Sequence, residues 1–507
     1  MGACGEWRIG LKKYRLHGLQ LLLGLGLLLM LPAFAAARAG GGEGYNGGGG
    51  DGGGGHGGGG GGGGGTLIQL IYLCIRYPAI GIPLLIIVAA VYYFSRTNNP
   101  NSPSGPPLVQ GRIPSAEQIG AIRAHDPAFD PGAFCNRVGA GFLKLQAAWC
   151  GQNLQQVRPF ISDGIHERFS LQFAEQKADG YRDRMDAVGI DQILICDAKS
   201  DEIYDQVSVR IVAHAADYKV SMRDGRPMEG VAPIQPFAEI WSFLRRRGGA
   251  TVPGKPGLLE GNCPNCGAPV AMNESANCTN CNALLRSGQY DWVLSEITQE
   301  SEWRPGGHRM VPGLMNLRQR DPEVNVQALE DRTSVIFWRK AAADRVGKLD
   351  PMFKVTSPVY GQAYANRLKA PPGTPRTYFG NCAVGAVNVL GFTSGDGEDR
   401  ALMEVRWSGV KFATRPDGHV QPIEPNMPHH TLFVLMRKST AKTDVAKGIS
   451  SAHCPNCGAP ESGGTGGACE FCGTALNDGS NGWVLDNILG FSDPAARSLL
   501  SQLNNGR

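Results

Sequence analysis

The sequence predicts an α+β protein made of two tandem units, each of which ends in a four-cysteine metal site. The first observation is a repeat, because the letters Cys-Pro-Asn-Cys-Gly-Ala-Pro at residues 263–269 return unchanged at residues 454–460. The second is a change of hydrophobic period before the first copy, from helical spacing to strand-like alternation. Helices followed by strands are typical of an α+β domain, and the repeat indicates that this domain was duplicated.

Eleven residues separate the second cysteine of each repeated motif from a second cysteine pair with the same spacing. Two such pairs supply the four sulfur ligands that Zn²⁺ prefers in closed structural sites. The alternative is a set of disulfide-bonded or simply buried cysteines. With four sulfurs no position is left for water, so we expect two structural zinc ions rather than catalytic ones. The expected ligands are Cys263, Cys266, Cys278 and Cys281 in the first site and Cys454, Cys457, Cys469 and Cys472 in the second.

The chain starts with a basic segment, an apolar run and a stretch of small residues, so residues 1–39 resemble a signal peptide. The apolar run is long for a signal, and an uncleaved first membrane helix is the alternative. This leader carries a net charge of +4, with five Lys and Arg against one Glu, which equals the formal charge of the whole chain. The rest of the protein is therefore neutral, and its charge gives no reason to expect a nucleic-acid partner.

Residues 40–65 contain 21 glycines and are expected to be a disordered tract, because such a segment buries no apolar surface. Residues 66–95 read as a transmembrane helix, with eighteen uncharged residues from 77 to 94 and aromatic residues at both ends. A buried soluble helix is the alternative. Residues 96–114 form a polar linker.

Both interpretations of the leader place the glycine tract outside the membrane and the rest of the chain inside. The tract lacks Lys and Arg, as expected for a translocated loop. Zinc-binding thiolates need a reducing compartment, which agrees with this orientation. We expect a protein of the bacterial inner membrane, single-pass after signal cleavage, with cytoplasmic C-terminal domains.

Residues 115–255 are expected to form the first α+β domain. Ser115 and Gln118 make a capping box for a short helix, and Asp130 followed by Pro131 starts a second helix that ends near Gly151. A third helix is expected from about residue 163 to 180, and strands are expected after Gly189 in a largely antiparallel sheet. The apolar stripe of the second helix consists of Phe134, Val138, Phe142, Leu145 and Trp149.

The same plan is expected to recur downstream. Residues 256–305 form the first zinc ribbon, 306–445 a diverged second domain, 446–495 the second ribbon and 496–507 a C-terminal tail. Phe142 falls opposite Phe337 in this alignment, and residues 122–127 line up with 317–322. The prolines at 371, 372 and 375 predict a loop where the first copy is still helical.

The chain resembles bacterial membrane proteins of the Tim-forty-four-like family, which is named after the mitochondrial import-motor anchor. The resemblance lies in the order of its segments: a leader, a glycine tract, a membrane span, a domain of helices followed by a sheet, and a cysteine ribbon. The matching residues are Asp126-Pro127, the helix at 134–149, the strand at 239–245 and the segment at 77–83. The resemblance implies two cone-shaped domains similar to the nuclear-transport-factor-two superfamily, each with an apolar pocket. It also implies membrane association and a link to protein translocation. This chain lacks the long charged N-terminal region of the mitochondrial relatives, so the tethering of a chaperone is not carried over.

We therefore expect a non-enzymatic, membrane-anchored scaffold that binds protein segments or lipid, with two linked binding surfaces. Nucleic-acid binding by the ribbons is one alternative, but Arg286 is the only basic residue between 263 and 297. An enzyme that uses the pocket is the other, with His166, His214 or Asp191 as candidates, and none of them lies in a recognisable catalytic motif.

Two further features have alternative interpretations. Basic residues end equivalent strands at 245–247 and 437–438, where they either face anionic lipid or are simply solvated. Trp292 and Trp483 lie close after the last cysteines of the two ribbons. We expect them to pack each ribbon against its domain; stacking on a ligand is the alternative.

Overall fold

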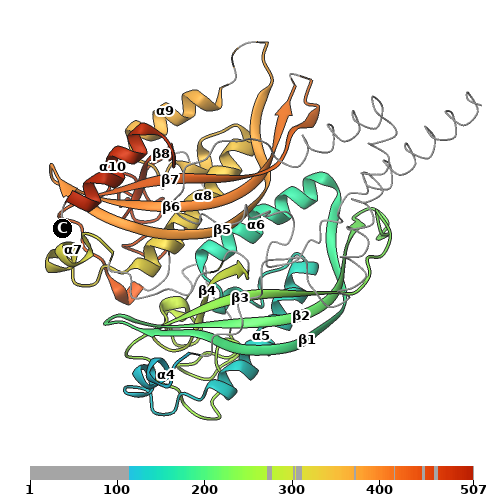
Figure 1. Cartoon of the computed structure of the whole chain (residues 1–507), viewed down its shortest axis with the longest axis vertical. Helices are drawn as coiled ribbons and strands as arrows, with labels where there is room; N and C mark the ends of the chain where they lie inside the picture. The colour runs from blue at the N-terminus through green and yellow to red at the C-terminus, as the bar shows by residue number, and fades with distance from the viewer. Residues whose placement is uncertain are drawn as a thin grey trace, which may run out of the picture. The chain divides into compact units, whose positions relative to one another are not determined.

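Two four-stranded antiparallel sheets, one in each half of the chain, form the framework of the protein (Figure 1). A computed structural model describes residues 114–270, 277–300, 303, 311–369, 371, 373–415, 417–447, 451–461 and 466–505. The expected leader, glycine tract, membrane span and all but the last residue of the linker lie outside this range. Within it, none of the helices combines the length and the apolar character that crossing a membrane requires.

The first half begins with helices and continues with strands, as the sequence predicts. Its helices are α4 (Ala116–Arg123), α5 (Pro131–Cys150) and α6 (Asp163–Asp179), with short 3-10 turns η1 (Arg158–Phe160) and η2 (Leu285–Ser287). Its strands are β1 (Tyr181–Ser200), β2 (Tyr204–Ser221), β3 (Gln235–Arg246) and β4 (Val293–Gln299), in that spatial order. The capping box of Ser115 and Gln118 and the Asp130 cap are both formed.

The second half repeats this order of elements. Its helices are α7 (Leu314–Arg320), α8 (Val326–Val346), α9 (Pro358–Leu368) and α10 (Pro494–Asn505), with 3-10 turns η3 (Asp350–Met352) and η4 (Val445–Lys447). Its strands are β5 (Arg376–Gly395), β6 (Glu398–Thr414), β7 (Val420–Lys438) and β8 (Val484–Gly490). The described prolines between α9 and β5 lie in a loop, as predicted.

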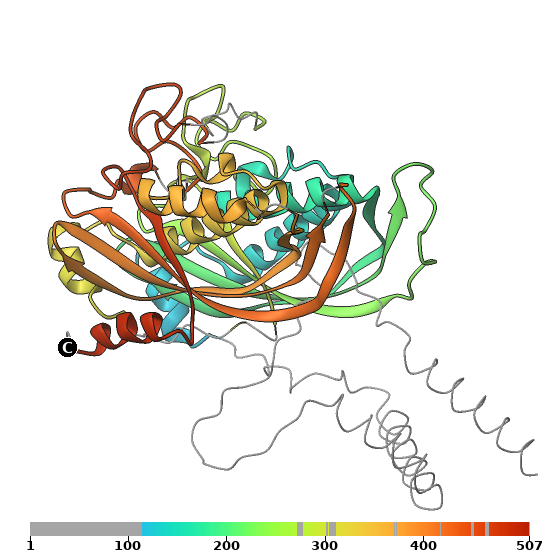
Figure 2. The same ribbon diagram turned by 90° about the horizontal axis from the view of Figure 1, so that it is seen from above.

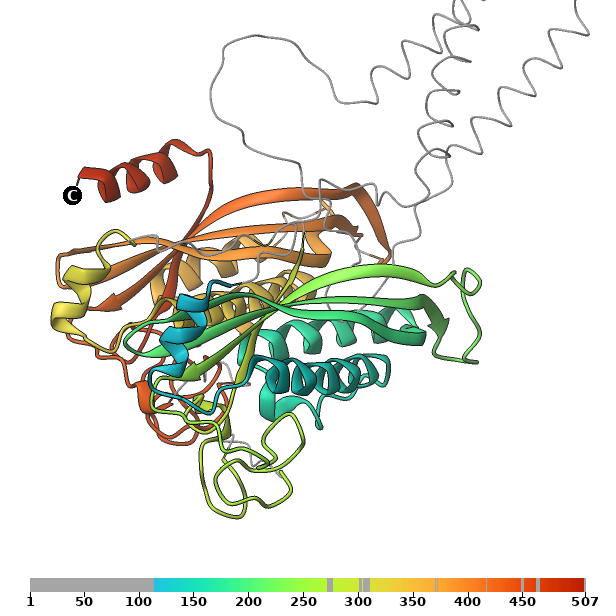
Figure 3. The same ribbon diagram turned by 60° about the horizontal axis from the view of Figure 1, so that its bottom comes forward.

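The core of each half lies between its long helix and its sheet. All five residues of the predicted α5 stripe are buried, and Phe142 packs against Trp241 with ring centroids 5.4 Å apart. Phe337, its predicted counterpart in α8, packs against Trp407 at 5.5 Å. Figure 3 shows α5 and α6 on one face of the first sheet. The equivalent phenylalanines therefore pack the long helix of each half onto a tryptophan of its sheet, which lies in the third strand in the first half and in the second strand in the second half.

Strand β1 starts nine residues earlier than the alternation after Gly189 predicts. Gly180 ends α6 in the left-handed conformation with φ 76°, and the strand begins at the next residue. The early part was missed because its inward positions include the polar Asp183, which accepts a hydrogen bond from Gln176 at 2.6 Å. A register shift between Asp186 and Gly189 then interrupts the alternation.

The fourth strand of each sheet lies in a range that the sequence suggested was ribbon. β4 pairs with β3, and β8 pairs with β7. Each ribbon is thus an insertion between the third and fourth strands of its sheet. Helix α10 lies on the face of the second sheet opposite α8 and α9 (Figure 2), where Leu503 packs with Leu402 and Leu432.

Candidate metal centres and buried ion networks

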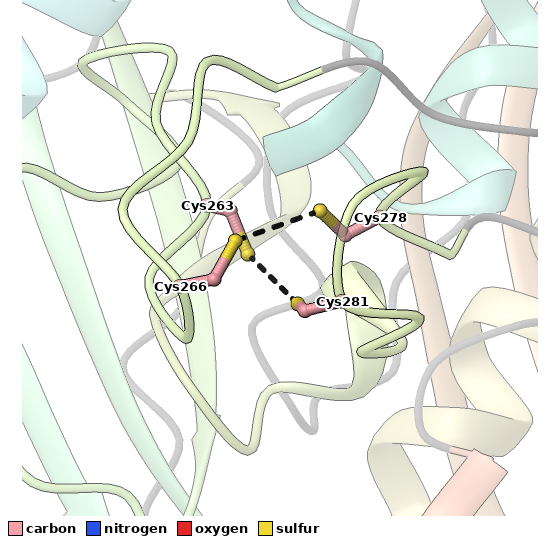
Figure 4. Close-up of side chains that lie close together, drawn as sticks. All are labelled: Cys263, Cys266, Cys278 and Cys281. Atoms are coloured by element: carbon pink, nitrogen blue, oxygen red, sulfur yellow. Dashed lines mark hydrogen bonds between the residues drawn. The ribbon is translucent and has the colours of Figure 1, made fainter.

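The first cysteine cluster joins two loops of the first ribbon. Cys263 and Cys266 come from one loop and face Cys278 and Cys281 from the other (Figure 4). The Sγ atoms of Cys263 and Cys281 are 3.7 Å apart, and those of Cys266 and Cys278 are 4.0 Å apart. Gly267 has φ 78°, a value that glycine adopts without strain, so the chain can turn directly after the pair.

The second cluster has the same geometry. The Sγ distances are 3.7 Å for Cys454 to Cys472 and 3.7 Å for Cys457 to Cys469. In each cluster all four sulfur atoms lie within 4.8 Å of one another. Gly458 has φ 73° at the position of Gly267, so the turn is repeated as well as the ligands.

These distances fit a metal ion and exclude a disulfide. A disulfide would bring two sulfurs to about 2.0 Å, whereas a tetrahedral ion with bonds of about 2.3 Å keeps its sulfurs about 3.8 Å apart. All eight cysteines are free thiols. The two predicted sets of ligands are thus brought together, and each cluster could hold one metal ion.

An arginine of the long helix holds each ribbon in place. In the first half, Arg137 of α5 binds Glu260 at 2.7 Å and Asp291 at 2.7 Å. Its counterpart Arg332 in α8 binds Glu461 at 2.7 Å and donates to the carbonyl of Trp483 at 3.1 Å. No local sequence pattern predicts these contacts, because the partners are more than 100 residues apart.

Of the basic residues that end β3 and β7, the first in each strand, Arg245 and Arg437, faces neither lipid nor solvent. Arg245 is 2% exposed and contacts Asp126 at 2.8 Å and Asp205 at 3.4 Å. Arg437 is also 2% exposed and contacts Asp321 at 2.7 Å and Asp399 at 3.4 Å. Both interpretations offered for these two arginines were wrong, because the carboxylates that bury them come from distant segments. Arg247 and Lys438, which follow them, are exposed.

These networks also explain why residues 122–127 resemble residues 317–322. His125 lies 2.9 Å from Asp205, and Arg320, at the same position of the second copy, lies 2.6 Å from Asp399. Burial raises the pKa of Asp126, but the hydrogen bonds from Thr251 and the charge of Arg245 together outweigh this and lower the pKa below its usual value. The Asp-Pro motif therefore supplies one carboxylate of a buried ion network in each copy.

Trp292 and Trp483 are packing residues, as predicted. They are 2% and 8% exposed. The guanidinium of Arg245 lies 4.4 Å from the ring centre of Trp292, and that of Arg437 lies 4.6 Å from Trp483. Each tryptophan thus links the end of a ribbon to the buried arginine of its domain.

Residues 115–255, which contain α4 to α6, β1 to β3 and the first network, match the family model described as "Tim44-like domain". The first half of the chain contains a Tim44-like domain. No curated protein matches the chain.

The Tim44-like domain and the rest of the chain were also compared with solved structures. An "Ntf2 like protein involved in plasmid conjugation" is 7% identical, with 66% of this chain and 90% of that one covered and a TM-score of 0.13. A structure titled "Crystal structure of lipopolysaccharide binding protein" is 7% identical, with coverages of 51% and 69% and a TM-score of 0.09. These scores carry no argument about the fold, so the cone shape expected for the two domains stays a prediction.

The Tim44-like domain contains all three residues considered for catalysis. His214 Nδ1 lies 2.8 Å from Asp191, but the two side chains are 38% and 47% exposed. His166 is half-buried in α6, and burial, assisted by Arg158, lowers its pKa to about 3. The structure therefore brings two of the three together, at an open position on the sheet.

One buried aspartate connects the Tim44-like domain with both ribbons. Asp163, at the start of α6, is fully buried and binds Arg286 of the first ribbon. It also accepts hydrogen bonds at 2.8 Å from His453 and from the backbone amide of Ala452, both at the start of the second ribbon. Burial raises its pKa, but Arg286, His453 and Arg158 together outweigh this and hold the pKa well below its usual range. Arg286, the only basic residue between 263 and 297, is thus withdrawn from the surface.

Proposed function

We propose that this protein is a membrane-associated, non-enzymatic scaffold whose duplicated domains bind protein segments or lipid at the cytoplasmic face of the bacterial inner membrane. The observation that carries this proposal is the Tim44-like domain at residues 115–255, a domain that suggests membrane-associated scaffolding. A link to protein translocation follows from the same resemblance. The expected span at residues 66–95 would supply the anchor.

Zinc is the metal that we propose for both ribbons. Four thiolates in a closed tetrahedral arrangement suit Zn²⁺, which has no redox chemistry and no need for an open position. Each ion would close a ribbon between two strands of a sheet. The need for reduced thiols supports the cytoplasmic placement of these domains.

A scaffold is favoured over an enzyme by the surroundings of the candidate residues. An exposed His–Asp pair on a sheet lacks the enclosed pocket in which acid–base groups act. Nucleic-acid binding is disfavoured because Arg286 is occupied by Asp163, and a phosphate-binding surface needs several free cations.

Two apolar tips at equivalent ends of the sheets offer surfaces for such contacts. Between β2 and β3, four large apolar side chains are 46–63% exposed: Met222, Met228, Val231 and Ile234. Near the start of β7, three more are 44–49% exposed: Val420, Ile423 and Met427. Exposed apolar groups that recur at the same place in both copies are typical of a binding surface.

Photo-crosslinking in intact membranes tests this function. A photoreactive amino acid placed at Met228 or Met427 is expected to give discrete crosslinked protein bands or lipid adducts. The matched control is Met315 in α7, which is 72% exposed but lies outside the tips. Crosslinks at the two tips that do not exceed those at Met315 would contradict the proposal.

A further inference from the structure

The second half contains an open cavity of about 400 Å³ between α8, α9 and the start of β5. Its volume is within the range of about 300 to 1,000 Å³ that is typical of small-molecule sites. The walls combine aromatic rings with basic side chains. The aromatic residues are Tyr360, Tyr364, Tyr378 and Phe379.

The first half shows what has changed to open this cavity. Ser162 caps α6 and Ser357 caps α9 in the same way, and they differ by 195 positions, as do Phe142 and Phe337. With this offset, Lys340 and Asp344 stand where the first half has Leu145 and Trp149. Likewise, Tyr360 and Tyr364 replace Ile165 and Phe169.

In the first half these positions are filled by apolar packing. Trp149 and Phe169 lie with ring centroids 5.2 Å apart, and Leu145 and Ile165 are at most 5% exposed. The exchange to Lys, Asp and Tyr removes this packing and leaves polar groups that line open space. Such a change costs stability, which suggests that the cavity is retained for binding.

The single carboxylate of the lining is already occupied. Asp344 accepts a hydrogen bond from Lys340 at 2.7 Å and another from the hydroxyl of Tyr364. Arg376 donates to the backbone carbonyls of Asp344 and Arg345. These bonds fix the floor of the cavity.

Positive charge remains at its mouth. The lining contains five cations, Lys340, Arg367, Lys369, Arg376 and Lys411, against the one carboxylate. Arg367 and Lys369 form no salt bridge within the part of the chain that the structure describes, and both are exposed. The guanidinium of Arg367 lies 5.3 Å from the ring centre of Tyr360 and 5.2 Å from that of Tyr364, so it is held over the two rings.

We propose that this cavity binds an organic anion, a phosphate or carboxylate carried on an apolar and preferably aromatic body. The stacked rings of Tyr360 and Tyr364, 5.8 Å apart at 27°, would contact the apolar body. Arg367 and Lys369 would contact the anion by charge-assisted hydrogen bonds. The cavity borders the second apolar tip, because Lys411 of its lining pairs with Glu424, which lies between Ile423 and Met427. The proposal nevertheless goes beyond the scaffold function, because it rests on the lining of the cavity and not on the exposed apolar side chains.

Phenyl phosphate is a suitable probe for the purified full chain, with inorganic phosphate and phenol as partial ligands. Calorimetric titration is expected to give saturable binding of phenyl phosphate that is tighter than binding of either part. The double variant Arg367→Gln with Lys369→Gln should weaken it at least about tenfold, since each lost charged contact is worth that much. Both residues are exposed, so this variant is expected to fold normally.

The matched control is Lys255→Gln with Arg497→Gln, which removes the same charge from exposed positions outside the cavity and both apolar tips. A second variant, Lys340→Leu with Asp344→Trp, restores the side chains of the first half and should close the cavity.

Repeating the titration in nanodiscs of phosphatidylcholine, with or without phosphatidylglycerol, distinguishes the source of the anion. If the affinity for phenyl phosphate is the same in both kinds of nanodisc, the site binds a soluble anion. If the affinity falls only in the nanodiscs that contain phosphatidylglycerol, the site binds a lipid phosphate. Equal affinity in the wild type and the Arg367/Lys369 variant, or no binding of phenyl phosphate, would overturn the proposal.

Discussion

Arg245 and Arg437 are charged, yet each is almost completely buried. A buried guanidinium is tolerated only when carboxylates neutralise it and accept its hydrogen bonds. Each arginine has two aspartates, and each second aspartate has a further basic partner, His125 or Arg320. The same balance in both halves indicates that this network, rather than an apolar contact alone, fixes the end of β3 and β7.

Replacing Asp126 by Asn should destabilise the first half, because Arg245 would keep its charge and lose its closest carboxylate. Breaking a buried ion pair typically costs about 3 to 5 kcal/mol. Denaturant unfolding of the full chain measures the change, and Asp321→Asn should have a similar effect on the second half. The control is Asp224→Asn, whose partner Arg226 is 85% exposed. If Asp126→Asn unfolds like Asp224→Asn, the network does not stabilise the fold.

The cysteine ligands could be predicted from the sequence because their spacing is local and repeated. The arginine networks could not, because their paired charges are separated by 38 positions for Arg437 and Asp399 and by as many as 119 for Asp126 and Arg245. A lone Asp or Arg in the sequence carries no sign of its partner. In the sequence, the Asp-Pro motif indicates only a likeness to a known family. Its role as a carboxylate of a buried ion network becomes visible only in the distances from Asp126 to Arg245 and from Asp321 to Arg437.

Each ribbon is an element inserted between the third and fourth strands of its sheet. The fourth strand follows directly, so the metal site determines where the chain re-enters the sheet. This explains why helices and caps could be predicted while β4 could not. Helix signals are local, whereas residues 293–299 became recognisable as a strand only through their pairing with β3.

The two metal sites should be occupied independently. Native mass spectrometry of the purified chain is expected to show two zinc ions, and Cys263→Ser or Cys454→Ser should each remove one. Loss of a structural zinc should also lower the unfolding midpoint, since metal binding contributes to folding free energy. Cys135→Ser is the control, because Cys135 lies outside both clusters and should leave both ions bound. One ion or none in the wild type would contradict the assignment.

The halves of the chain meet through half-buried acidic side chains as well as through the Asp163 network. Glu296 of β4 and Glu330 of α8 line one small cavity of about 70 Å³. Burial, together with the charge of Glu296, raises the pKa of Glu330 to about 8. Burial also raises the pKa of Glu296, although Thr298 and Lys199 oppose it.

This arrangement predicts a stability that falls with rising pH. The carboxyl of Glu330 holds its proton more tightly in the folded state than in the unfolded state. Its contribution to the free energy of unfolding is therefore complete below its ordinary pKa of 4.5 and is lost as pH rises through about 8. The denaturation midpoint should therefore fall between pH 5 and pH 8, and Glu330→Gln should reduce that fall. Glu229→Gln, at an exposed position, serves as the control and should behave like the wild type. An unchanged pH dependence in Glu330→Gln would show that this carboxyl is not responsible.

The whole molecule can act as the proposed scaffold only if it is attached to a membrane through residues 66–95, which lie outside the described structure. Membrane fractionation of cells that express the full chain or a chain without residues 67–94 tests this most directly. If the leader is cleaved, the full chain should stay in the membrane fraction after alkaline carbonate washing, and the shortened chain should move to the soluble fraction. A shortened chain that remains in the washed membranes would contradict the anchor and the scaffold built on it.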